Sequence, residues 1–67
     1  MELDNTQKKA ILTAHIEAKG NEIWTLDSIA SANKKAGAED EAKRLIALSA
    51  TASRVKECLE EQLKELA

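Results

Sequence analysis

The sequence predicts an all-α protein, an antiparallel two-helix hairpin that dimerises into a four-helix bundle. Three observations favour this fold: proline is absent from the 67 residues, strong helix formers dominate the chain, and the clearest break falls near the middle, at Gly37. We therefore expect a single helical domain over residues 1–67, with a helix at about 4–36, a turn at about 36–38 and a second helix at about 39–66.

The C-terminal half carries the most regular pattern, in which apolar residues alternate at spacings of three and four. This is the heptad pattern of coiled coils, which keeps one apolar stripe facing a partner helix. Charged residues fill the intervening positions and belong in water. The predicted stripe consists of Leu45, Leu48, Ala52, Val55, Leu59, Gln62 or Leu63, and Leu66.

The N-terminal half has two neighbouring apolar stripes, which cover more than half of a helix circumference. A helix that is apolar this far round is buried on two sides. We expect one side to pack against the second helix and the other against a second subunit. The first stripe contains Leu3, Ala10, Ile11, Ala14, Ala18, Ile29, Ala32 and Ala36, and the second contains Leu12, Ile16, Ile23, Leu26 and Ala30.

Gly20 and Asn21 form a possible stop inside this first helix, because both residues tolerate the left-handed conformation that ends helices. A break there would give a monomeric three-helix bundle, with Thr25 capping the middle helix. The favoured interpretation is a continuous helix, since the second stripe keeps its spacing across Gly20 and a mid-helix glycine costs only about 1 kcal/mol.

Two ends of the predicted helices have clear sequence signals. Asp4 or Asn5 can cap the first helix by accepting a hydrogen bond from a free backbone N–H. Lys34 and Lys35 precede Gly37, and acidic residues follow it, so both helix dipoles near the turn meet favourable charges. Gly37 fits the left-handed position just beyond a helix end.

The residue counts and the net charge exclude several classes of protein. A single cysteine, Cys58, excludes an internal disulfide, and a single histidine, His15, argues against a metal site, so we expect no metal and no cofactor. The net charge of −2 gives no broad attraction to nucleic acid or to membranes. No membrane span or signal peptide is predicted, which favours a cytoplasmic protein. A chain this short needs support for its small core, and oligomerisation is the support that remains.

No catalytic motif is recognisable, and the chain is not expected to be an enzyme. His15 reads as a residue at the boundary of the apolar face, and Cys58 as a small packing residue beside the stripe position Leu59. Trp24 points away from both stripes. It is either a contact for a partner or a cover for the chain near Gly20.

The sequence thus favours a small non-enzymatic protein–protein interaction module, an adaptor, regulator or co-chaperone that acts through an exposed apolar helical face. Its partners are expected to be a second copy of itself, as a homodimer, and another protein. The residues expected to bind a partner are Ile11, Trp24, Ile29, Leu45 and Leu48.

The alternative function is a nucleic-acid-binding regulator. Phosphate binding requires several cations on one surface, and four cations flank the predicted turn. Acidic residues sit among these cations, so this function is the second choice. The residues concerned are Lys34, Lys35, Lys43 and Arg44.

Overall fold

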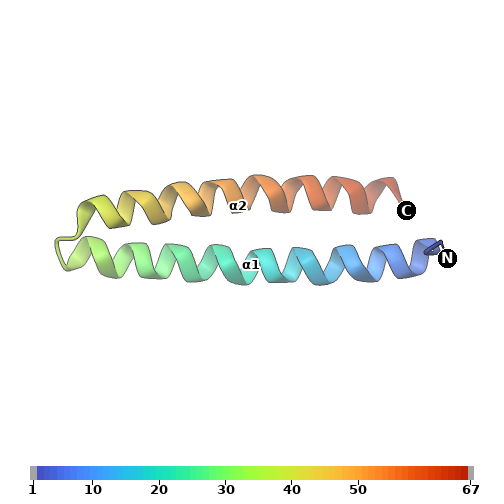
Figure 1. Ribbon diagram of the computed structural model, residues 1–67, viewed down its shortest axis with the longest axis horizontal. Coiled ribbons are helices and arrows are strands. Elements are labelled where there is room, and N and C mark those ends of the chain that lie inside the picture. The colour runs from blue at the N-terminus through green and yellow to red at the C-terminus, as the bar shows by residue number, and fades with distance from the viewer. Residues whose placement is uncertain (1, 67) are drawn as a thin grey trace.

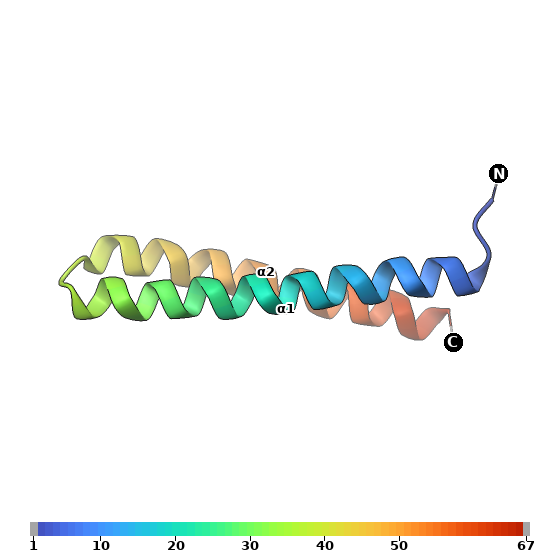
Figure 2. The same cartoon turned by 90° about the horizontal axis from the view of Figure 1, so that it is seen from below.

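A computed structural model describes residues 2–66 and contains two helices, α1 (Asn5–Lys35) and α2 (Glu39–Glu65). The helices run antiparallel and side by side, with both chain ends at the same end of the molecule (Figure 1). The view from below shows that they stay paired along their length and cross at a shallow angle (Figure 2). The molecule measures 51 × 18 × 14 Å. The predicted all-helical hairpin is confirmed, with no strand among residues 2–66.

The first helix begins with a complete capping box. The Asp4 carboxylate accepts a hydrogen bond from the Gln7 backbone N–H at 2.8 Å, and the Gln7 side chain accepts one from the Asp4 N–H at 3.0 Å. These bonds satisfy N–H groups that a helix start leaves free. From this cap α1 continues without interruption through Gly20, so the three-helix alternative is not the fold of this chain.

The turn between the helices follows from one glycine. Gly37 has a φ of +86°, in the left-handed region that glycine adopts without steric cost. Its N–H donates to the Lys34 carbonyl at 3.1 Å, and the Ala38 N–H donates to the Asn33 carbonyl at 2.8 Å. This pair of bonds is the Schellman motif, which satisfies the last carbonyls of a helix. The reversal at Gly37 brings α2 back along α1.

The two helices meet along one seam with a seven-residue repeat. The less exposed residues of both helices recur at alternating spacings of three and four, as in a coiled coil. In α1 these are Lys9, Leu12, Ile16, Lys19, Ile23, Leu26, Ala30 and Asn33. In α2 and at its C-cap, Leu66, they are Ala42, Leu45, Ser49, Ala52, Lys56, Leu59, Leu63 and Leu66.

The predicted stripe of α2 was wrong at two positions. Leu48 is 45% exposed and Val55 is 39% exposed, whereas their neighbours Ser49 and Lys56 occupy the seam. The physical reason is size. A small side chain at position 49 lets the helices approach closely, and Lys56 can lay its methylene stem along the seam while its ammonium group stays in water.

Contacts across the seam fix which residues lie at the same height. A Cβ built on Gly20 would lie 3.9 Å from the Cε of Lys56. Lys34 lines a hollow with Ala42, and Leu12 lines another with Leu66. This antiparallel register places Ala30 level with Leu45 near the turn and Ile16 level with Leu59 near the open end.

Candidate interaction surface

Large apolar side chains remain on the surface of the hairpin. Their exposed fractions run from 39% for Val55 to 72% for Trp24. By contrast, only four hydrophobic residues within residues 2–66 are buried, and three of them are alanines: Ala30, Ala42, Leu45 and Ala52. The exposed set consists of Leu3, Ile11, Trp24, Ile29, Ile46, Leu48 and Val55.

Four of these exposed residues lie on one side of the seam. In the heptad frame set by the seam, Ile29, Leu48 and Val55 occupy flanking positions on the same side, and Ile11 lies just beyond them. The hollow that contains both Lys8 and Gln62 shows that these flanks of α1 and α2 adjoin. We call these four residues, together with the exposed alanines beside them on α1, the apolar face: Ile11, Ala18, Ile29, Ala32, Leu48 and Val55.

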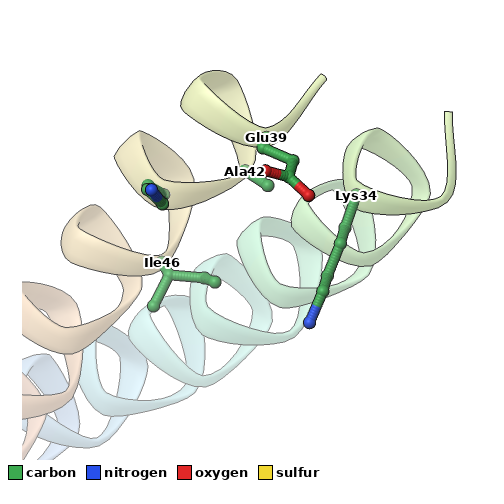
Figure 3. A pocket seen from close by; sticks show the side chains of 5 residues that line it. Lys34, Glu39, Ala42 and Ile46 are labelled. Atoms are coloured by element: carbon green, nitrogen blue, oxygen red, sulfur yellow. The ribbon is translucent and has the colours of Figure 1, made fainter. Parts of the chain in front are cut away.

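The opposite flank has a different character. Ile46 lies there, 54% exposed, beside Lys34 and Glu39 in the hollow near the turn (Figure 3). The remaining seam-flanking positions on this side are mainly polar or small, including Gly20, Asp27 and Ser53. The hairpin is therefore asymmetric, because the aliphatic flanking residues lie mainly on one side, where they alternate with polar residues such as His15, Glu22 and Gln62.

The five residues expected to bind a partner divide into three groups. Ile11, Ile29 and Leu48 all lie on the apolar face, Ile29 and Leu48 toward the turn and Ile11 toward the chain ends. Trp24 is exposed but projects from the outer side of α1, where it lines an open hollow made by that helix alone. Leu45 is 7% exposed and lies in the interior between the helices. Val55, which belonged to the predicted stripe but not to the predicted site, completes the face.

The four basic residues near the turn do not share one surface. Lys34 and Lys43 line the same hollow, together with the carboxylate of Glu39 (Figure 3). Lys35 lies instead beside Trp24 on the outer side of α1. Arg44 is engaged within α2, where its Nε donates to the Glu41 Oε2 at 3.1 Å.

This Arg44–Glu41 pair is the main electrostatic feature near the turn. The hydrogen bond from the guanidinium group lowers the pKa of Glu41, and the carboxylate in turn raises the pKa of Arg44. Both groups lie one helical turn apart at the surface. The pair therefore occupies Arg44 with a neighbour and reduces its availability for phosphate.

The remaining candidate residues are exposed. Cys58 is a free, exposed cysteine, so its predicted packing role was wrong, because it lies one position outside the seam residue Leu59. His15 is exposed as well. Within residues 2–66, no group of three or more His, Cys, Asp or Glu side chains is arranged to hold a metal ion. Neither helix is long and apolar enough to cross a membrane.

Comparison of the chain with known protein family models, with curated proteins and with solved structures gives no match.

Proposed function

We propose that this chain is a small non-enzymatic interaction protein, an adaptor, regulator or co-chaperone, whose apolar face packs against the helices of a partner. A second copy of the chain is the first such partner, and the product is a four-helix bundle. Packing of helices along a stripe of aliphatic side chains is a common mode of recognition.

The observation that supports this proposal most strongly is that the core buries little apolar surface while large aliphatic side chains remain exposed. Among the described residues, no side chain reaches full burial, while four large aliphatic side chains stand on one face, each more than a third exposed. A hairpin alone buries only one side of each helix. Because burial of apolar surface contributes about 25 cal/mol per Å², covering this face would add substantially to a small core.

The dimensions of the face fit the same proposal. The broad side of a 51 × 18 Å molecule presents an area of about 900 Å². Stable interfaces bury roughly 800 Å² on each partner. The whole broad side would thus be used in a bundle of two hairpins.

The nucleic-acid alternative receives less support from the geometry. Phosphate binding needs free cations on one surface, and Arg44 is paired with Glu41 while Lys35 lies apart from Lys34 and Lys43. Electrophoretic shifts of RNA and DNA over a salt series test this alternative. A salt-sensitive shift that is lost when the four basic residues are replaced would favour it over our proposal.

The proposal is tested by two matched variants of α2. Leu48→Gln removes an aliphatic side chain from the apolar face, and Ile46→Gln removes one of similar exposure from the opposite flank. Each Leu48→Gln dimer loses two buried leucines, so its dissociation constant should rise about tenfold or more. Ile46→Gln should leave the dissociation constant of the dimer nearly unchanged. Sedimentation equilibrium measures both, and equal effects of the two variants would contradict the proposal.

A further inference from the structure

We infer that two copies associate through the apolar face in an antiparallel orientation, so that the turn of one hairpin lies over the open end of the other. This inference rests on the proposed function and adds the orientation of the partner. It follows from two independent features, the placement of the aliphatic side chains along the face and the charge difference between the two ends.

The apolar face is compatible with reversal about its centre. Ile11 and Ile29 are separated by 18 residues of α1, or about 27 Å of helix. Their midpoint is Gly20, which lies level with Lys56 and Val55. An antiparallel two-fold axis at this level places Ile11 against Ile29 of the partner copy and Val55 against its own equivalent, and it sets Leu48 level with Gln62 of the partner copy. Self-complementarity of this kind is what a two-fold interface requires.

A parallel arrangement fits the same side chains less well. With both turns at one end, α1 of one copy would lie over α2 of the other at the same height. Leu12 shares a hollow with Gln62 and Glu65, so those two residues lie at the height of Ile11. Ile11 would then face an amide and a carboxylate, and only Ile29, which lies near the height of Leu48, would meet an aliphatic side chain of the partner copy.

The charges at the two ends favour the same orientation. The turn end, residues 34–44, carries four cations and three carboxylates, a formal charge of +1. The open end, residues 2–10 together with 57–66, carries three cations and six carboxylates, a formal charge of −3. A parallel dimer would place the two negative ends together. An antiparallel dimer pairs each negative end with a positive one, and like charges in proximity disfavour association.

The antiparallel register also brings specific opposite charges together along α2. Arg44 lies near the turn end and Glu65 near the open end, at similar distances from the level of Val55. Reversal about that level brings Arg44 of one copy, which also donates to Glu41 of its own helix, to the height of Glu65 of the partner copy. Both residues flank the apolar face, on the rim, where charged pairs influence orientation more than affinity.

Distances between spin labels test the orientation directly. Asp40→Cys in a Cys58→Ser chain places a nitroxide at the turn, and Arg54→Cys in the same background places one near the proposed axis; both native residues are exposed. In the antiparallel dimer the labels at position 40 are separated along the axis by 30 residues of helix, about 45 Å. The labels at position 54 lie within about 25 Å of each other, because neighbouring helices are roughly 10 Å apart.

The possible outcomes separate this inference from the proposed function. A long distance at position 40 together with a short one at position 54, measured by double electron–electron resonance, supports the antiparallel dimer. Short distances at both positions, or a mixture of long and short at position 40, overturn the orientation but leave association through the apolar face intact. An absence of dipolar coupling at both positions, in samples that light scattering finds to be monomeric, overturns both.

Discussion

The two halves of the hairpin have the same fold but different packing. The five buried residues of the described part of the chain, residues 2–66, all lie in the half nearer the turn: Ala30, Ala42, Leu45, Ser49 and Ala52. In the half nearer the chain ends, the seam residues are larger, and none of them is buried. They are the aliphatic residues Leu12, Ile16, Leu59, Leu63 and Leu66 and the lysines Lys9, Lys19 and Lys56. The half with the larger seam side chains is thus the half with the looser core.

Side-chain size explains this difference. Near the turn, a small residue on one helix lies level with a large one on the other, as Ala30 does with Leu45, and the helices can approach closely. Near the open end, large residues such as Ile16 and Leu59 lie level with each other. The distance between helix axes follows the side chains at the contact, so two large side chains leave access for solvent. Burial in a two-helix structure depends on complementary size as well as on hydrophobicity.

The largest change in the free energy of unfolding should come from a substitution in the closely packed half near the turn. Leu45→Ala should lower the free energy of unfolding by about 3 kcal/mol, because it leaves a cavity among closely packed small residues. Leu59→Ala should cost roughly half as much, since its site is already partly open to water. Urea unfolding followed by circular dichroism, at one protein concentration for all variants, measures both. An equal or larger cost for Leu59→Ala would contradict the comparison.

The next largest effect should come from substituting alanine for each of the two glycines. The two substitutions should change the free energy of unfolding in opposite directions. A Cβ at Gly20 meets only the end of the Lys56 side chain at 3.9 Å, an ordinary contact. Gly20→Ala should therefore raise the free energy of unfolding by about 1 kcal/mol through helix propensity.

Gly37→Ala is the matched control. Nothing lies within 4 Å of its added Cβ, but the φ of +86° is strained for alanine. This variant should lose about 1 kcal/mol. Thermal unfolding of the two variants and of the parent chain gives the sign of each change in stability. A loss of stability in Gly20→Ala would show that the helices are closer at this level than the structure indicates.

The smallest effect concerns the exposed Glu41–Arg44 pair at the turn end. The pKa of Glu41 is lowered in the folded chain, so its carboxylate contributes stability above its ordinary pKa of 4.5. That contribution should be lost as the pH falls below this value. Glu41→Gln should reduce this loss, and Glu61→Gln, at a glutamate that forms no ion pair with Lys64, is the control. Thermal unfolding from pH 6 to pH 3 measures the effect, and an unchanged pH profile in Glu41→Gln would contradict it.

Much of the fold was predictable from local signals. Asp4, Gly37 and the lysines before the turn act within a few residues of the chain, so the caps and the reversal could be identified without knowledge of the packing. The continuity of α1 was also predictable, because the second apolar stripe keeps its spacing across Gly20. These features depend on local backbone chemistry and periodicity.

The seam of α2 was harder to predict. The prediction of the interaction site depended on it, because the seam decides which residues of α2 are exposed. Two candidate stripes differ by a rotation of one residue, with Leu48 and Val55 in one and Ser49 and Lys56 in the other. Counting apolar residues selects the first stripe. The structure uses the second, because the choice depends on which side chains fit against α1. Leu45 belongs to both stripes and lies in the interior, whereas the rotation leaves Leu48 and Val55 on the surface.

An antiparallel pair of hairpins would offset the difference between the halves. It would place the tightly packed half of each copy over the looser half of the other, and cover the apolar face of both. On this account the open end gains its missing burial from a second copy rather than from its own chain.

The most direct test of this account is the solution mass of the chain under reducing conditions, measured by light scattering across a dilution series. Reducing conditions are needed because Cys58 is exposed and could join chains by oxidation. The account predicts a stable dimer, with twice the 7.3 kDa mass of one chain. A monomer that stays helical and cooperatively folded at every concentration would contradict it.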